Sequence, residues 1–352
     1  MPSLPDILGQ DRAIGIVRQA IDSGRLHHAW IFHGPAGVGK RTTAEALAAL
    51  LLDPTTAPNL SGELEPDPDS PTQRQIAAGS HPDLHLVNKE LAAFSREDSV
   101  RRSKQRSIAI DVIREFLIEP ATRSGGERGE SLARKVFILD EAHLMGREAA
   151  NAALKILEEP PPGVVFILIT DDESSLLPTI RSRCQRVAFA PLDDQSMRAW
   201  AKRANLKLPK AQEDWLLEFA DGSPGRAVTA LETGLYEWAG AVEPLLAQID
   251  QGRFPDALGP TIASLIDAWA KARVDETKNA SKDIANKAGA DHMFALLANW
   301  ARRRLRAAAA RNADPEPAAH AVDLIDEAQR RLEANANMSL VFDNLAAQLA
   351  TR

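Results

Sequence analysis

Residues 31–50, IFHGPAGVGKRTTAEALAAL, contain a glycine-rich loop whose spacing is typical of phosphate binding. Gly34, Gly39 and Lys40 match the pattern of a glycine, four residues, a second glycine and a lysine. Backbone N–H groups of such a loop converge on phosphate oxygens, and the helix that follows adds its positive end. The pattern predicts a nucleotide-binding set made of Gly34, Pro35, Ala36, Gly37, Val38, Gly39, Lys40, Arg41 and Thr42. The alternative is a plain glycine-rich turn between a strand and a helix.

The residue after the lysine departs from this pattern. Arg41 stands where a serine or threonine hydroxyl normally reaches Mg²⁺. A guanidinium has only donors and cannot ligate a metal. Thr42 follows, but it is rotated by about 100° around the helix axis and is poorly aimed at such a metal. The sequence therefore leaves ATP binding open and predicts weak hydrolysis or none.

Two acidic residues end an apolar segment, VFILDEAH at 136–143. At the end of a strand, Asp140 would hold Mg²⁺ weakly through water, and Glu141 would polarise an attacking water. The next apolar segment ends in Thr170 and Asp171, and a polar side chain there can reach a terminal phosphate. Capping of the strand end explains Thr170 equally well. No other metal site is predicted, because the histidines lack a metal-binding spacing.

Two arginines are candidates for contacts with nucleotide phosphates. Arg183 lies in PTIRSRCQR at 178–186, where it would stabilise charge in a neighbouring subunit's nucleotide site or simply face solvent. Arg226 lies in DGSPGRA at 221–227, where it would contact a nucleotide held by the first domain or stay exposed in the first turn of a helix. Cys184 is expected to be a small buried apolar residue and not a nucleophile.

The elements that must position these residues form an α/β pattern, because several short apolar runs end at candidate residues. The expected strands are 29–32, 83–87, 135–140, 164–170 and 186–191. The Ala- and Leu-rich residues 42–52 predict a helix buried against the sheet. The proline-rich residues 53–79 predict a poorly ordered loop or insertion.

After residue 191 the expected elements are all helices. Residues 192–236 predict three short helices, and residues 237–352 predict long Ala- and Leu-rich ones. We expect an α/β nucleotide-binding domain at 1–190, a small helical lid domain at 191–236 and a helical oligomerisation domain at 237–352.

Composition argues against several classes of protein. The 352-residue chain has a formal net charge of −7, so we do not expect it to bind DNA tightly by itself. Its one cysteine allows neither an internal disulfide nor a cysteine-based zinc site, and it fits a cytoplasmic setting. No apolar run approaches the roughly 18 residues that span a membrane, and the start of the sequence lacks the features of a signal peptide.

Several segments together resemble the bacterial clamp-loader AAA+ subunits of DNA polymerase III, and in particular the delta prime type. The segments that carry the resemblance are ILGQDRAI, GRLHHAWIFHGPAGVGK, VFILDEAHLMGREAANAALKILEEPPPGVVFILIT, LLPTIRSRC and GSPGRA. The resemblance covers most of residues 5–235 and is most specific at 135–184. The remainder is similar only in its helical character and length.

The resemblance implies an AAA+ P-loop domain, a helical lid and a helical collar within a hetero-oligomer that uses ATP to load a sliding clamp on primed DNA. The implied partners are the gamma/tau and delta subunits, the sliding clamp and, through the complex, DNA. It implies that Arg183 acts on a neighbour's ATP, that Arg226 is a sensor, and that Asp140 and Glu141 are the catalytic acids. The delta prime type hydrolyses ATP poorly or not at all, and Arg41 agrees with this.

The sequence also departs from the family. Many relatives carry a four-cysteine zinc module after the phosphate-loop helix, and this chain has no cysteine there, so no zinc is expected. Delta prime chains can lack the loop lysine, whereas Lys40 is present. Two other hypotheses stay open: a self-sufficient AAA+ ATPase of the gamma/tau type, and a degenerate P-loop scaffold without a role in replication. The sequence leaves undecided whether the chain is an enzyme by itself.

Overall fold

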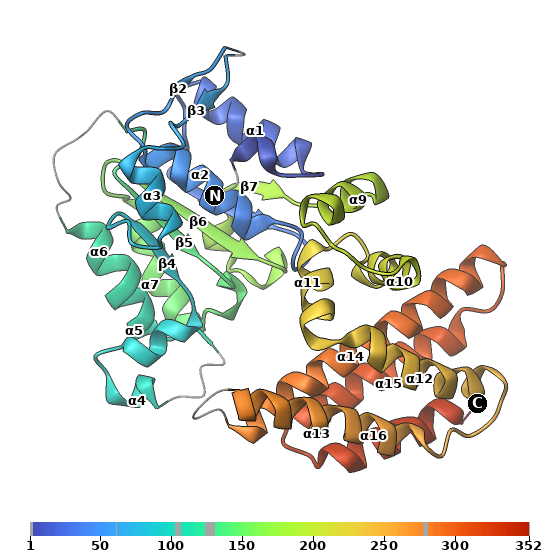
Figure 1. The fold of residues 1–352 in the computed structure, drawn as a ribbon. Coiled ribbons are helices and arrows are strands. Elements are labelled where there is room, and N and C mark those ends of the chain that lie inside the picture. Colours follow the sequence, from blue (N-terminus) through green and yellow to red (C-terminus); the bar gives the residue numbers. More distant parts are fainter. Residues whose placement is uncertain (1–2, 61, 103–106, 124–130, 277–280, 352) are drawn as a thin grey trace. The chain divides into compact units, whose positions relative to one another are not determined.

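The structure is a computed structural model that describes residues 3–351 except 61, 103–106, 124–130 and 277–280 (Figure 1). The chain divides into two compact units. The first runs to Leu206 and includes Asp221–Gly225, and the second comprises Lys207–Ala220 and the chain from Arg226 onward. The three-domain division with boundaries at 190/191 and 236/237 stays a prediction.

A five-stranded parallel sheet forms the centre of the first unit (Figure 1). In spatial order its strands are β4 (Leu84–Val87), β5 (Lys135–Leu139), β6 (Val164–Thr170), β1 (Ala29–His33) and β7 (Gln185–Ala188). Every residue of β5 and β6 is buried. Parallel strands covered on both faces carry unbroken apolar runs, so the sequence could predict them. The five expected strands are confirmed, although the last one ends at Ala188 and not at residue 191.

Helices pack around this sheet, and the predicted buried helix is confirmed as α2 (Lys40–Leu52). Its Ala and Leu side chains are buried over most of the helix surface because it lies in the core beside β1, β5 and β6. The other helices described in this unit are α1 (Asp11–Asp22), α3 (Pro71–Ala77), α4 (Asp98–Arg101), α5 (Ile110–Ile113), α6 (Glu119–Thr122), α7 (Arg147–Glu158), α8 (Pro178–Arg181) and α9 (Asp194–Arg203). Short 3₁₀ segments include η2 (Lys89–Phe94), η4 (Ala142–Leu144) and η5 (Glu173–Ser175).

The proline-rich segment after α2 has defined structure, so the prediction of a poorly ordered loop was wrong. It contains α3 and a short antiparallel pair, β2 (Ala57–Pro58) with β3 (Leu64–Glu65). The buried carboxylate of Asp53 organises it by accepting hydrogen bonds from Thr55 Oγ1 at 2.7 Å, Ser70 Oγ at 2.5 Å and Gln73 Nε2 at 2.9 Å. The pattern missed this because the partners of Asp53 lie up to 20 residues away along the chain.

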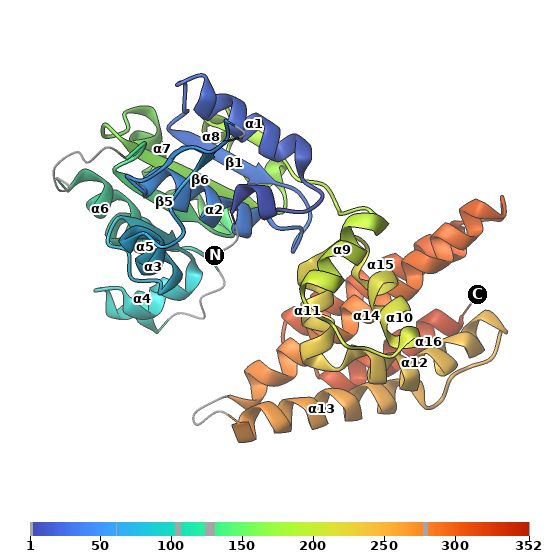
Figure 2. The same ribbon diagram turned by 45° about the horizontal axis from the view of Figure 1, so that its top comes forward.

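The second unit is helical in the part that the structure describes (Figure 2). Its helices are α10 (Lys210–Ala220), α11 (Pro224–Thr233, of which Pro224 and Gly225 belong to the first unit), α12 (Leu235–Asp250), α13 (Leu258–Glu276), α14 (Lys282–Ala310), α15 (Glu316–Glu333) and α16 (Met338–Ala350). Helices α13, α14 and α16 pack together around buried Ile266, Leu297 and Phe342. The three short helices expected at 192–236 are confirmed as α9, α10 and α11.

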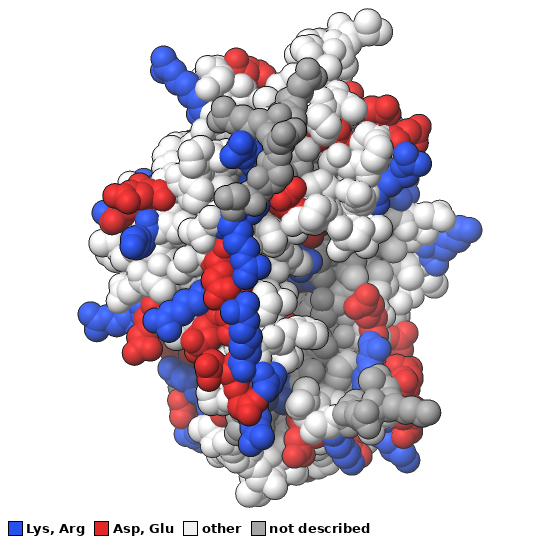
Figure 3. All heavy atoms as spheres, turned by 90° about the vertical axis from the view of Figure 1, so that its left-hand side faces the viewer, with Lys and Arg blue, Asp and Glu red and all other residues white. Residues whose placement is uncertain are grey.

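Several positive charges on the described surface are paired with nearby acids. On the face shown in Figure 3, Lys and Arg side chains lie among Asp and Glu side chains. Near α6, Arg96 and Arg123 both pair with Glu119, at 3.1 and 3.3 Å. In the second unit, Arg304 of the basic stretch in α14 pairs with Asp250 at 3.0 Å. Arginines paired in this way are less available to a nucleic-acid backbone than unpaired ones.

Candidate functional site

The glycine-rich loop occupies the turn between the carboxyl end of β1 and the start of α2, so the predicted strand–loop–helix arrangement is present. Gly34, Gly37 and Gly39 have φ values of 138°, 75° and 103°, which favour glycine. At Gly34 a side chain is also excluded by space, because a Cβ atom would lie 2.1 Å from the carbonyl oxygen of Phe189, just after β7. These glycines therefore have a conformational reason besides any contact with phosphate.

Lys40 is buried, with 4% of its surface exposed, and its ammonium group is satisfied inside the protein. Nζ donates hydrogen bonds to the carbonyl oxygens of Gly34 and Pro35 and to Oδ1 of Asp171, each at 2.6 Å. Asp171 follows β6, the strand next to β1 in the sheet. The lysine thus joins the loop to the neighbouring strand end, and an anion bound there would compete with Asp171 for it.

Arg41 reaches the acid that the sequence assigned to magnesium. Its Nη1 lies 3.3 Å from Oδ2 of Asp140, and its Nε donates to Oε1 of Glu45 at 2.9 Å. Partial desolvation lowers the pKa of Arg41, but the hydrogen bonds and charges of Glu45 and Asp140 outweigh this and raise it above its usual value. A permanently charged guanidinium therefore stands beside the carboxylate that would hold the metal.

The residues around the loop do not fit Mg²⁺. This ion requires oxygen ligands in near-octahedral geometry and usually keeps carboxylate and hydroxyl partners. Arg41 offers no ligand and repels a dication at the Asp140 carboxylate. Further along α2, the hydroxyl of Thr43 is buried and donates a hydrogen bond to the carbonyl oxygen of Gly39 at 2.9 Å, so it is already used inside the protein. Thr42 lies half-buried in the first turn between them.

The second predicted acid, Glu141, is held by a residue that the sequence analysis missed. Lys89 Nζ donates to Oε1 of Glu141 at 2.8 Å. Lys89 follows β4 and Glu141 follows β5, and these strands are neighbours in the sheet. Since parallel strands end at the same edge, a lysine two residues after β4 was the available signal. Glu141 also has a left-handed backbone, with φ of 50°, which fixes its side chain beside that edge.

Thr170 is buried at the end of β6 and uses its hydroxyl in local contacts. Oγ1 donates to the carbonyl oxygen of Asp172 at 2.8 Å and accepts from the N–H of Asp172 at 3.2 Å. It also lies 3.4 Å from Nδ1 of His143. These contacts are those of a strand-end cap, while Asp171, one residue on, is the side chain that reaches the loop lysine.

The DGSPGRA motif touches the glycine loop through its first residues. Within the first unit, Ser223 Oγ donates to the carbonyl oxygen of Ala36 and the N–H of Gly225 donates to that of Gly37, both at 2.9 Å. A Cβ atom on Gly225 would lie 2.6 Å from Cα of Gly37, so glycine permits this approach. The sequence had indicated a role only for the arginine of this motif, Arg226, and not for the residues that precede it.

Arg226 is the first residue of the motif that belongs to the second unit. Its guanidinium lies over the ring of Phe219 in the same unit, 5.2 Å from the ring centre. A cation above an aromatic face is attracted by the ring electrons. The contact of Arg226 with a nucleotide stays a prediction.

Arg183 lies apart from the residues gathered around the loop. It follows α8 and pairs with Glu158 at the end of α7, with Nη2 2.6 Å from Oε1. Its Nη1 donates to the carbonyl oxygen of Thr179 at 2.8 Å, and 35% of the side chain is exposed. Cys184 beside it is half-buried against the core, and desolvation raises the pKa of its thiol to about 12. The thiol is therefore protonated and is no nucleophile at neutral pH.

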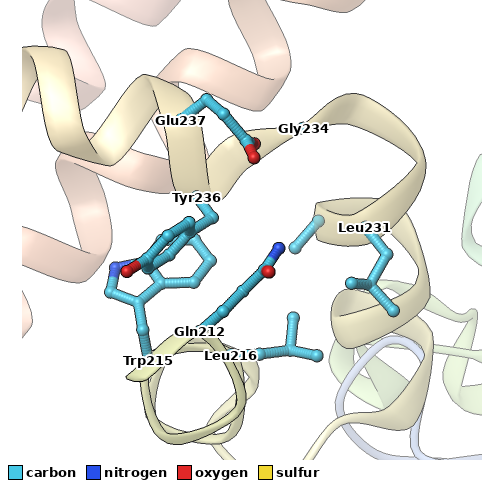
Figure 4. Close-up of a pocket in the computed structure, with 8 residues that line it drawn as sticks. Gln212, Trp215, Leu216, Leu231, Gly234, Tyr236 and Glu237 are labelled. Atoms are coloured by element: carbon cyan, nitrogen blue, oxygen red, sulfur yellow. The ribbon is translucent and has the colours of Figure 1, made fainter. Parts of the chain in front are cut away.

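The second unit has a small hollow that sequence analysis did not predict. It measures about 170 Å³ and lies among α10, α11 and the start of α12 (Figure 4). Gln212, Leu216 and Glu237 line it together with Trp215, whose ring meets that of Tyr236 edge-on at 5.5 Å between centres.

In the described part of the chain, no group of three or more His, Cys, Asp or Glu could hold a metal ion. None of the described helices combines the length and apolarity needed to cross a membrane.

Comparison with known proteins gives the family. Residues 9–193, slightly more than half of the chain, match the family described as DNA polymerase III, delta subunit. The chain belongs to this family. The resemblance drawn from the sequence is thereby confirmed. The expected fold class is confirmed in its α/β domain with a parallel sheet and in the helical regions that follow.

Several known proteins are similar to this chain. DNA polymerase III subunit delta' of Pseudomonas aeruginosa is 35% identical over 56% of this chain and 53% of its own length. DNA polymerase III subunit gamma/tau of Mycobacterium tuberculosis (strain H37Rv) is 29% identical over 75% of this chain and 42% of its own length. The chain thus spans about half the length of these relatives. A gamma subunit-related protein from Thermotoga maritima is 19% identical, with a TM-score of 0.47 over 96% of this chain and 98% of its own.

Proposed function

We propose that this chain is a delta prime-type subunit of a DNA polymerase III clamp loader, which hydrolyses little or no ATP itself and supplies Arg183 to a neighbouring subunit's ATP. Its partners are the gamma/tau and delta subunits and the sliding clamp, and it takes part in loading the clamp on primed DNA during replication. Family membership and the delta prime relatives support the assembly role.

The observation that carries the proposal is the pairing of Arg41 with Asp140 at 3.3 Å. Hydrolysis of ATP by this kind of site needs a metal held by the loop hydroxyl and the strand-end acid. Here the hydroxyl is replaced, and its replacement occupies the acid. The second acid, Glu141, is paired with Lys89 at 2.8 Å. Both acids are thus engaged with cations of the same chain.

Arg183 is also paired with an acid of its own chain, but this partner, Glu158, is 47% exposed, which supports a role in which the pair is exchanged for an external phosphate. Its hydrogen bonds and ion pair involve Thr179, Ser182 and Glu158, and both members of the ion pair are more than one-third exposed. An exposed ion pair contributes little stability, about 0–1 kcal/mol, so a stronger phosphate partner can replace Glu158. We infer that Glu158 holds the guanidinium until a neighbour's nucleotide is in place.

The experiment is an ATPase assay of the reconstituted loader with Arg183→Ala. An arginine supplied in trans raises the rate of hydrolysis at the site it serves by about 10³–10⁵-fold. We therefore expect Arg183→Ala to abolish measurable hydrolysis at the neighbour's site. Assembly, measured by size-exclusion chromatography, should be unchanged. The matched control is Arg186→Ala, which removes another exposed arginine of the same segment that pairs with Glu173 at 3.0 Å. Normal turnover by the Arg183→Ala assembly contradicts the trans role.

A second candidate function is that of a self-sufficient ATPase of the gamma/tau type. Lys40 and Glu141 are present, and the gamma/tau relatives align with three quarters of the chain. In that case the purified chain hydrolyses ATP with Mg²⁺, and Arg41→Thr changes the rate little. Absence of turnover by the pure chain, with gain of some turnover in Arg41→Thr, favours the first candidate.

A further inference from the structure

We propose that the glycine loop binds a nucleoside polyphosphate, with a preference for the diphosphate, without any divalent metal, because the guanidinium of Arg41 supplies the positive charge that Mg²⁺ would bring. The inference deepens the proposed function and depends on its view of this loop as non-hydrolysing. It does not depend on Arg183.

The first argument is position. Arg41 is the second residue of α2, directly after Lys40, and its Nη1 is tethered by Oδ2 of Asp140 at 3.3 Å. In a metal-dependent site the same carboxylate orients the metal toward the phosphates. The strand-end carboxylate therefore orients a cation in both kinds of site: Mg²⁺ in a metal-dependent site, and the guanidinium of Arg41 in this chain.

The second argument is that an arginine here is otherwise unfavourable. The first turn of a helix is its positive end, where a cation is disfavoured. The chain compensates with two carboxylates, since Glu45 holds Nε at 2.9 Å and Asp140 holds Nη1. The unfavourable charge at position 41 is thus compensated by one acid on α2 and one acid after β5. This compensation indicates that the positive charge of Arg41 has a function, such as binding an anion.

The third argument is donor capacity. A guanidinium has five N–H donors, and the contacts with Glu45 and Asp140 use Nε and one terminal nitrogen. About half of the Arg41 side chain is exposed, and none of the hydrogen bonds described for it uses the other terminal nitrogen. Lys40 adds a second cation, whose present partner Asp171 is itself half-exposed. Charge-assisted hydrogen bonds from both residues suit phosphate oxygens.

The charge of Arg41 also explains the expected preference for a diphosphate over a triphosphate. A guanidinium carries one positive charge where Mg²⁺ carries two, so the site neutralises less of the ligand's charge. A diphosphate has less charge to neutralise than a triphosphate. We therefore expect ADP to bind more tightly than ATP, whereas a magnesium-dependent site gains from the additional phosphate.

The test measures binding of fluorescent ADP and ATP analogues to the isolated full chain, in excess EDTA and in excess Mg²⁺. We expect the wild-type chain to bind the ADP analogue in EDTA, and to bind it more tightly there than the ATP analogue. Excess Mg²⁺ should not tighten this binding and should weaken it, because Mg²⁺ complexes the free nucleotide and Arg41 repels the metal. Arg41→Thr should bind at least about tenfold more weakly in EDTA and recover when Mg²⁺ is added, since it restores the metal's hydroxyl ligand. Arg41→Lys should keep metal-free binding in part, because it keeps the charge.

Arg74→Thr is the matched control, as it removes an exposed arginine from another helix of the same unit. It should bind as the wild type does, and circular dichroism should show all variants folded. Failure of the wild-type chain to bind in either condition overturns the proposal, and so does tightening by Mg²⁺ to the same extent in wild type and Arg41→Thr. Because no partner subunit is present, either failure leaves the role of Arg183 in the assembly untouched.

Discussion

The glycine loop and the Arg183 segment lie in the same α/β unit but treat their charges differently. Around the loop, each of three cations is paired with an acid from another element: Lys40 with Asp171, Arg41 with Asp140, and Lys89 with Glu141. Arg183 has one acidic partner, Glu158, and the two side chains are 35% and 47% exposed. The cations of the loop are thus tied to acids that follow neighbouring strands of the sheet, whereas Arg183 is tied to the end of a helix. In the proposed function, this difference separates a loop with little hydrolysis of its own from an arginine that serves a neighbour.

The largest effect should come from changing the two regions separately in the assembled loader. Arg183→Lys keeps the charge but loses the planar fork that contacts phosphate oxygens, so we expect about 10³-fold slower turnover at the neighbour's site. Lys40→Ala should change the rate of the assembly less than about twofold, because this chain's own site contributes little turnover. A large loss in Lys40→Ala, measured as steady-state phosphate release, would remove the contrast between the two regions.

The next effect concerns the stability of the loop. Gly34→Ala should destabilise the chain by about 3 kcal/mol or more, since the new Cβ would meet the Phe189 carbonyl oxygen and the φ of 138° strains any other residue. Gly15 on α1 is the control, because no heavy atom lies within 4 Å of a Cβ placed there. Gly15→Ala should be neutral or stabilising by about 0.5–1 kcal/mol. Urea unfolding measures both, and equal stabilities would contradict the packing at Gly34.

A smaller effect is expected for the stability of the chain at low pH, which depends on Asp53, a buried acid with a structural role, and not on the acids beside the loop. Desolvation raises the pKa of Asp53, but hydrogen bonds from Ser70, Thr55 and Gln73 outweigh it and lower the pKa below the usual 3.8. The ionised carboxylate therefore stabilises the fold above that pH, and this contribution is lost as the pH falls through the lowered value. Asp53→Ala should cost about 2–4 kcal/mol at pH 7 and flatten the acid side of the stability curve. An unchanged profile from pH 5 to 2 would show that the network is not formed.

The smallest effect tests the surroundings of Arg183. The pKa of about 12 leaves Cys184 with roughly a thousandfold less thiolate than an ordinary thiol with a pKa of 9.0. Ellman's reagent should react slowly with the folded chain and rapidly after unfolding in urea. Because desolvation and not Arg183 dominates the shift, Arg183→Ala should leave this slow rate unchanged. Rapid labelling of the folded wild type would mean that the segment opens in solution.

The sequence by itself determined much of the α/β unit. The strands β1, β5 and β6 were predictable because strands buried on both faces consist of unbroken apolar residues, and the loop because its glycines and Lys40 have a spacing with few other uses. The loss of the metal's hydroxyl at Arg41 was also visible, since it depends on one residue type at one position. These features are local, so adjacent residues encode them.

Only the tertiary structure decided which cation meets which acid. Lys89 and Glu141 are 52 residues apart, Arg41 and Asp140 are 99 apart, and Lys40 and Asp171 are 131 apart. The order of strands in the sheet brings each pair to one edge, and no periodicity records that order. For the same reason the Asp53 network, whose donors come from a turn and from α3, gave an apparently unstructured proline-rich segment its fold. Contacts between distant elements carry the charge balance of this site, and they exist only once the sheet has formed.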